Sequence, residues 1–255
     1  MKKLIASFVA LMLLASAAFS QEGKKVTIRW FGQSFFQIET TAGTKIVLDP
    51  HAIEQYPRNS VQADLVLISH PHLDHSTLTP VENRDKAKVL AGIKVNGRRQ
   101  EWNNIDEKFR EVHVYSIGLY HDKESGMQRG RNTAFVIEFD GLRVCHLGDL
   151  GHELTDKQAQ AIGHVDILMI PVGGIYTING TEAKAVVAKL KPTRYILPMH
   201  YGTKVFEDLL GPDEFLDGLK NVDKQLNTNE LVIDPSQKPP EQPKVLLLSW
   251  KKGGD

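Results

Sequence analysis

The chain has 255 residues with 31 basic and 31 acidic side chains, so its formal net charge is zero. This balance argues against nucleic acid as a partner, because binding a polyanion normally requires clustered lysine and arginine. With 41% apolar residues and a single cysteine, the chain can bury a large core but cannot form an internal disulfide.

The first twenty residues have the pattern of a secretory signal peptide. Two lysines precede an uncharged apolar run over 4–19, and small residues lead up to Ser20. We predict cleavage after Ser20 and one domain over 21–255, located in the periplasm or secreted. Cleavage leaves 29 basic and 31 acidic side chains, a net charge of −2. The run is shorter than the ~20 apolar residues of a spanning helix, so we expect no stable membrane insertion; an uncleaved anchor is the alternative.

The first half of the chain is predicted to consist mainly of strands. Short apolar runs, either alternating with polar residues or continuous and β-branched, indicate strands in this region. They cover residues 25–31, 35–39, 44–48, 64–68, 88–91 and 111–116. Asp49 closes the third strand, and residues 94–108 are expected to form a polar excursion on the surface.

The second half alternates strands with helices. Asp140-Gly141 is a favoured two-residue turn and predicts a hairpin between strands over 131–138 and 142–147. Helices are predicted over 156–162, capped by Thr155, and from Thr181 as cap to Leu190. Strands follow over 165–171, 193–197 and 244–250. This order predicts a single α/β domain with layered sheets.

The loop after the predicted strand 64–68 reads Ser-His-Pro-His-Leu-Asp-His-Ser. It places four metal-binding groups within six residues: His70, His72, Asp74 and His75. Imidazole and carboxylate suit zinc, iron or manganese, and four such groups can supply most of the ligands of two neighbouring ions. A polar turn that is rich in histidine by chance is the alternative.

Three more candidate ligands, His121, Asp149 and His200, follow other apolar runs. A histidine or aspartate at a strand end more often forms a turn or a surface hydrogen bond. Strand ends, however, can aim side chains from distant parts of a sheet at one point. Together with the histidine-rich loop, these residues favour a metal site.

The combined pattern resembles the metallo-β-lactamase-fold hydrolases, and most closely the branch that includes ascorbate-6-phosphate lactonase. Residues 70–75 match the His-x-His-x-Asp-His signature, and the resemblance covers residues 25–250. It implies an α/β fold of the αβ/βα four-layer sandwich type. It also implies a division of ligands: His70, His72 and His121 for one ion, Asp74, His75 and His200 for the second, with Asp149 bridging the two.

By the same resemblance, two divalent ions are the implied cofactors, zinc first, with manganese or iron as alternatives. Asp49 matches an aspartate that orients a ligand histidine. A pair of ions lowers the pKa of a shared water and polarises the scissile bond, so hydrolysis by a metal-bound hydroxide needs no serine or cysteine nucleophile. The implied activity is hydrolysis of a small ester, lactone, amide or phosphoester.

Three residues are candidates for catalytic roles. Asp74 is placed in the reaction as well as among the ligands. His152 lies three residues after Asp149 and could assist proton transfer, with a plain loop histidine as the alternative. Tyr176 follows Gly173-Gly174 and could protonate a leaving group, with a tight turn as the alternative.

Substrate binding is predicted from residues near these positions. The hydroxyls of Tyr176 and Thr177 could contact substrate. Arg129 and Arg131 flank a glycine and could clamp a carboxylate or phosphate, although a solvated loop is the alternative. Substrate identity does not follow, because selectivity lies in loops that carry no readable code.

Two other functions remain open. A phosphodiesterase or nuclease of the same fold is disfavoured by export and by the lack of a basic patch. A non-catalytic metal-binding protein of the cell envelope is disfavoured because every ligand position is present. The expected partner is thus a small-molecule substrate and not nucleic acid, and a homo-oligomer is compatible with the sequence.

Overall fold

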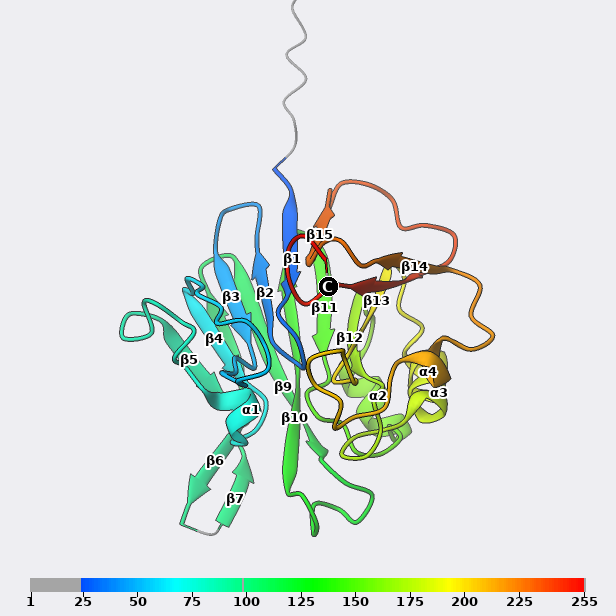
Figure 1. The fold of residues 1–255 in the computed structure, drawn as a ribbon. Coiled ribbons are helices and arrows are strands. Elements are labelled where there is room, and N and C mark those ends of the chain that lie inside the picture. The colour runs from blue at the N-terminus through cyan, green and yellow to red at the C-terminus, as the bar shows by residue number, and fades with distance from the viewer. Residues whose placement is uncertain (1–23, 98, 255) are drawn as a thin grey trace, which may run out of the picture.

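The structure, a computed structural model, describes residues 24–97 and 99–254, so the predicted signal peptide lies outside the described residues. Two mixed sheets pack against each other, and a separate two-stranded hairpin projects beside them (Figure 1). One continuous apolar core contains side chains from both sheets. This is the layered α/β architecture that the sequence predicts.

The first sheet has the strand order β15-β1-β2-β3-β4-β5. Its strands are β1 (Val26–Trp30), β2 (Phe36–Glu39), β3 (Lys45–Leu48), β4 (Leu65–Ile68), β5 (Lys88–Ala91) and β15 (Glu230–Ile233). The first three form the predicted antiparallel meander, and β4 and β5 continue parallel to β3. β15 was not predicted; it returns from the far end of the chain to pair with β1.

The second sheet has the order β14-β16-β13-β12-β11-β10-β9-β8. Its strands are β8 (Asp106–Phe109), β9 (Val112–Tyr120), β10 (Arg131–Phe139), β11 (Leu142–His146), β12 (Ile167–Pro171), β13 (Tyr195–Met199), β14 (Val222–Gln225) and β16 (Lys244–Leu248). The predicted hairpin of β10 and β11 is confirmed. Asp140 and Gly141 both have positive φ, 50° and 73°, as a tight hairpin turn requires.

Three helices gather beside the second sheet (Figure 1): α2 (Asp156–Ile162), α3 (Gly180–Leu190) and α4 (Asp213–Leu216). Thr155 caps α2 as predicted. The predicted cap of α3 is wrong: the side chain of Asn179 accepts the N–H of Glu182, while the Thr181 hydroxyl donates to Glu214. No helix among the described residues is long and apolar enough to span a bilayer.

The outer face of the first sheet is covered mainly by loops. In the described residues its only helical element is α1 (Leu73–Ser76), a single turn inside the histidine-rich loop. Val47 and Val66 point to this face and pack with Phe35 and Val81 in a second apolar cluster. The run 65–68 is therefore buried on both faces of the sheet, which explains why it is apolar throughout.

The predicted polar excursion over 94–108 is mostly polar and lies at the surface, but its strands were not predicted. This region contains the hairpin of β6 (Ile93–Asn96) and β7 (Arg99–Trp102), followed by β8. The indole N–H of Trp102 donates to the carbonyls of Leu119 and Asn132, which docks the hairpin on β9 and β10. Its strands carry mostly polar residues, so no apolar pattern in the sequence indicates them, and they are recognised only from their pairing in the structure.

Candidate metal centre

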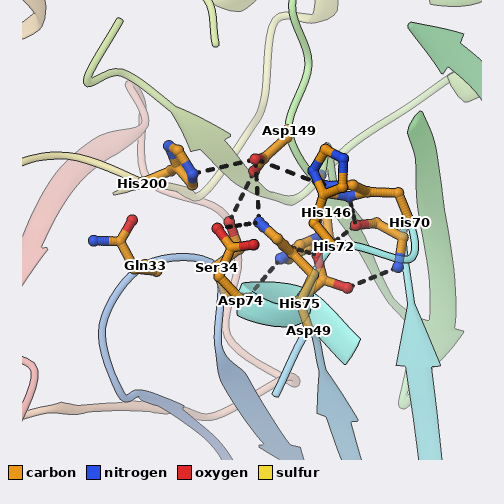
Figure 2. Close-up of polar contacts among 12 residues, drawn as sticks. Gln33, Ser34, Asp49, His70, His72, Asp74, His75, His146, Asp149 and His200 are labelled. Atoms are coloured by element: carbon orange, nitrogen blue, oxygen red, sulfur yellow. Dashed lines mark hydrogen bonds and ion pairs between the residues drawn. The ribbon is translucent and has the colours of Figure 1, made fainter. Parts of the chain in front are cut away.

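The seven predicted ligand residues come together where strand ends meet. Figure 2 labels all of them except His121. Because β4 and β12–β13 are parallel members of their sheets, the loops after them emerge on one edge. The loop after β4 and helix α1 contribute His70, His72, Asp74 and His75, and the ends of β9, β11 and β13 contribute His121, Asp149 and His200.

One carboxylate oxygen lies at the centre of the cluster. Asp149 Oδ2 is 3.1 Å from Nε2 of His75 and 3.1 Å from Nε2 of His200. Nε2 of His121 lies 3.2 Å away, and Nε2 of His70 lies 3.9 Å away. Four imidazoles from three separate segments therefore face a single carboxylate oxygen. One oxygen has two lone pairs, so this is more than its hydrogen bonding needs.

The donor atoms divide into two main groups. His70, His72 and His121 form one, and Asp74, His75, Asp149 and His200 form the other; within each group the atoms lie within 4.8 Å of one another. This is the division that the family resemblance implies. A third combination, Asp49 with His70 and His75, overlaps both. The cluster is buried except at His72, which is exposed, and Asp74, whose side chain is 42% exposed.

The donors fit a divalent metal ion. Nε2 of His75 is buried and has no hydrogen-bond partner, although it lies 3.4 Å from Asp74 Oδ2. His70 Nε2 and His72 Nδ1 approach to 3.0 Å. A buried nitrogen without a hydrogen bond beside two carboxylates, and two imidazole nitrogens that face each other, are what a bound zinc, manganese or iron ion would satisfy.

Asp49 sets the orientation of two of these histidines. Its Oδ2 accepts from Nδ1 of His75 at 2.9 Å and from the Ser69 hydroxyl at 2.6 Å. Since an ionised carboxylate only accepts, His75 carries its proton on Nδ1. Ser69, having donated to Asp49, accepts from Nδ1 of His70 at 2.9 Å. Both Nε2 atoms are thereby left free to face the cluster.

The electrostatics of the site attract positive charge. Burial would lower the pKa of His75, but Asp149, Asp49 and Asp74 raise it well above its usual value. Burial would raise the pKa of Asp149, but the charges of His200 and His75 hold it well below the usual range. Burial likewise opposes ionisation of Asp74, yet His75 lowers its pKa to about 2. These carboxylates are therefore ionised at neutral pH.

Three residues that support the site were missed by sequence reasoning. The buried Ser34 donates its hydroxyl proton to Asp149 Oδ1 at 3.4 Å, and Asn132 Oδ1 accepts the backbone N–H of Asp149 at 3.1 Å. Ser69, described above, is the third. Their signal in the sequence is weak, since each is one polar residue beside an apolar run, and only the fold brings them to the ligands.

The backbone near the site is strained at several positions. Asp49 and His200 have positive φ, 43° and 49°, and neither is glycine. The N–H of His200 donates to the carbonyl of Gln33, which itself has a φ of 48°. A Cβ atom on Gly173 would collide with the carbonyl of His200. Such conformations concentrate at functional sites because the surrounding structure must hold them.

The proton-transfer role predicted for His152 stays a prediction, and the ring nitrogens of this residue contact backbone groups. Its Nε2 accepts the N–H of Tyr120 at 3.2 Å, and its Nδ1 lies 2.8 Å from the carbonyl of Glu153. Both ring nitrogens are thus engaged by backbone groups. These contacts join His152 to the end of β9.

The predicted substrate residues fall into two places. Arg129, Tyr176 and Thr177 line a cavity of about 350 Å³ together with His121. Arg131 lies elsewhere: its guanidinium donates to the carbonyl of Gln100 at 2.7 Å and stacks on Trp102. The two arginines therefore do not clamp one anion: Arg131 begins β10, while Arg129 lies in the loop before it, on the other side of a turn at Gly130, whose φ is 91°.

Comparison with known proteins agrees with this site. A family model described as the beta-lactamase superfamily domain matches residues 27–200. Fold and site thus define a metal-dependent hydrolase of the metallo-β-lactamase superfamily.

Relatives share this description. A UPF0173 metal-dependent hydrolase of Pyrococcus furiosus is 28% identical over 200 residues, covering 70% of this chain and 85% of the relative. Another from Methanocorpusculum labreanum is 31% identical, covering 69% and 83%. This chain belongs to the UPF0173 family of metal-dependent hydrolases within that superfamily.

Solved structures support the same assignment. A Thermotoga maritima protein assigned as a Zn-dependent hydrolase of the metallo-beta-lactamase superfamily is 32% identical, with a TM-score of 0.67, and covers 88% of this chain and 99% of its own. A metallo hydrolase of Ignicoccus hospitalis, 23% identical with a TM-score of 0.53, covers 75% and 88%, and shares the fold.

Proposed function

We propose that this chain is an exported hydrolase with two divalent metal ions, zinc first, that cleaves a small ester, lactone, amide or phosphoester. The observation that carries the proposal is the pair of donor groups that meet at Asp149. Within this range we favour a lactone, on the resemblance to the lactonase branch. Export is inferred from the apolar run over 4–19.

Two ions bound by these donors would supply hydroxide at neutral pH and polarise the scissile bond. The chain's own residues do the rest. Asp49 and Ser69 hold His70 and His75 in the orientation that leaves Nε2 toward the cluster. Substrate has access at the exposed His72, and the hydroxyl of Tyr176 lines the adjoining cavity, where it can donate a proton to a leaving group.

Single substitutions of ligands test the metal assignment. We expect His70→Ala, His75→Ala and Asp149→Ala to lose bound metal and hydrolysis together, as measured by elemental analysis and turnover. His164→Ala is the matched control, because its side chain is 59% exposed and belongs to none of the donor groups. Full metal content and normal turnover in all three variants would refute the proposal.

The number of ions is tested by stoichiometry. We expect two equivalents in the intact protein and about one in His121→Ala, since removing one of three donors from the first group leaves the second complete. Elemental analysis of protein purified from its own compartment also identifies the metal. One equivalent in the intact protein would contradict the two-metal proposal.

Turnover and export are tested separately. Metal-loaded protein should hydrolyse members of a panel of esters, lactones and phosphodiesters, whereas full loading without turnover on any of them would favour a metal-binding protein. Oligonucleotides should remain intact. For export, N-terminal sequencing of protein from the native host should begin after Ser20; a start at Met1 would contradict cleavage.

A further inference from the structure

The cavity beside His121 has a volume of about 350 Å³, enough for a small ligand group. It is built from the end of β9, the β9–β10 loop and the loop after β12. It adjoins the donor group formed by His70, His72 and His121, and so a molecule held in it would present a bond to that side of the cluster.

One positive charge in this cavity has no counter-charge. The guanidinium of Arg129 lies over the ring of Tyr176, 4.7 Å from its centroid, and Nη2 is 3.5 Å from the carbonyl of Ile175. Among the described residues no carboxylate forms an ion pair with it. An arginine stacked on an aromatic ring keeps its remaining N–H donors available for a carboxylate or phosphate.

Two of the three carboxylates of the cavity wall are engaged elsewhere. Asp122 accepts four backbone N–H groups of its own loop at 2.7–3.0 Å. Glu182 pairs with Lys123 and accepts the N–H of Asn179. Glu124 is exposed and forms no ion pair with the arginine. Since Lys123 is paired with Glu182, the guanidinium of Arg129 is the positively charged group of this cavity that is left for an anionic ligand.

Arg129 is also held in place. One of the four N–H groups bound by Asp122 is its own, at 2.7 Å, which fixes the backbone from which the side chain extends. On the opposite wall, the N–H of Tyr176 donates to the carbonyl of Gly174 at 2.6 Å across Ile175, whose φ is 58°. Such three-residue turns are rare and strained, above all with a β-branched centre. The turn places the Tyr176 ring under the guanidinium and leaves Ile175 53% exposed beside it.

We propose that Arg129 binds an anionic group of the substrate, a carboxylate or a phosphate, while the bond to be cleaved lies at the His121 side of the metal centre. Ile175 contacts an apolar part of the same molecule. The substrate is thus a small ester, lactone or amide that carries a negative charge within one cavity length of the scissile bond. This inference rests on the proposed hydrolase function.

Calorimetry on the zinc-loaded full chain tests Arg129 without requiring turnover. Succinate and inorganic phosphate are titrated into the unaltered protein, Arg129→Gln, Arg129→Lys and Arg110→Gln. Arg110 is the matched control, because it also stacks on an aromatic ring, Phe109, but lies outside the cavity. We expect Arg129→Gln to weaken binding of at least one anion by about tenfold or more, since a charged hydrogen bond contributes this much. The anion affinity of Arg129→Lys should lie between those of the unaltered protein and Arg129→Gln.

The anion that loses more affinity identifies carboxylate or phosphate as the ligand group. Equal affinity in all four proteins would overturn the proposal, because it would mean that the metal ions alone bind the anion. Circular dichroism of each variant checks the fold.

A matched pair of esters provides the second measurement. For mono-4-nitrophenyl succinate, Arg129→Gln should lower kcat/KM, mainly through KM, at least about tenfold more than for the uncharged 4-nitrophenyl acetate. Equal losses on both esters would overturn the role of Arg129 even if hydrolysis is confirmed. If the unaltered protein cleaves neither ester, the proposed function is in doubt, and the calorimetry still decides whether Arg129 binds an anion.

Discussion

The buried donor cluster and the exposed rim beside it are built on opposite principles. We define the rim by four side chains in the flanking loops, Leu73, Met127, Ile175 and Tyr176, which are 81%, 80%, 53% and 42% exposed. In the cluster, His70, His75, His121, Asp149 and His200 are at most 3% exposed. Apolar groups thus face solvent at the rim, while ionisable groups are buried in the cluster.

This inversion indicates a division of labour. Buried charges are costly unless each is paired, so the cluster is held by Asp49, Ser69 and Ser34 and tolerates little change. The rim has few such contacts, so its residues can vary at small cost in stability. This contrast supports the proposal that the cluster determines the chemistry and that the rim determines the choice of substrate.

Metal removal should have the largest effect on stability, and this effect comes from the cluster. Metal ions that bind only the folded state stabilise it, and a chelator removes that contribution. At a metal concentration a thousand times Kd, that contribution is about 4 kcal/mol, which corresponds to a Tm lower by roughly 10 °C for a domain of this size. Thermal scans with and without chelator measure it. An unchanged Tm would mean that the cluster does not bind metal in the folded chain.

Asp49→Asn should have the next largest effect. Asparagine tolerates the left-handed backbone at this position, where φ is 43°. Oδ2 of Asp49 accepts from both His75 Nδ1 and the Ser69 hydroxyl, and Oδ1 accepts the backbone N–H of Ser69. An asparagine would turn its NH2 group toward one of these donors, so the contacts that orient His75 and Ser69 cannot all be kept. We expect metal affinity to fall by about 10- to 100-fold, measured by competition with a chromogenic chelator.

Asp64→Asn is the control for Asp49. Asp64 also lies at the end of a strand, directly before β4, and accepts a backbone N–H, from Lys45 at 2.9 Å, but it lies outside the donor groups. Equal metal affinities in the two variants would show that Asp49 does not contribute to metal binding by the cluster.

Ile175→Gly tests whether strain at the rim serves function. Relief of a left-handed β-branched residue contributes about 1–2 kcal/mol, and the added chain entropy of glycine offsets about 0.5–1 kcal/mol. We expect Tm to rise by about 1–3 °C while kcat/KM for mono-4-nitrophenyl succinate falls.

Val95→Gly is the control for Ile175. Val95 is 50% exposed in β6 without a positive φ, so its replacement should lower stability. A loss of stability in Ile175→Gly of the same size would contradict the strain argument.

The smallest effect is expected for alkylation of Cys145, because its thiol is buried in the folded protein. Burial raises the pKa of its thiol from 9.0 to about 12, so the folded state retains this proton as pH rises above 9 while the unfolded state loses it. The contribution to stability is present below pH 9 and declines toward pH 12. We expect no alkylation by iodoacetamide at pH 8 until the chain is unfolded, measured by mass spectrometry. Rapid alkylation of folded protein would show that the core around β11 opens readily.

The sequence by itself determined the chemistry of the site. The loop over 70–75 carries four donors within one turn, and His121, Asp149 and His200 each follow an apolar run. Spacing of this kind is local, so it can be recognised from the sequence without knowledge of the fold. The role of Asp49, at a strand end, was instead implied by the family resemblance. Alternation of apolar residues likewise determined most strands of both sheets.

Only the tertiary structure decided what supports and surrounds those donors. Ser34 and Asn132 reach Asp149 across 115 and 17 residues of chain, and β15 pairs with β1 across the whole domain. Arg129 and Arg131 are alike in sequence, yet one lines the cavity and the other stacks on Trp102. The physical reason is that hydrogen bonding and side-chain direction depend on partners that folding brings together from distant segments, and no local pattern records them.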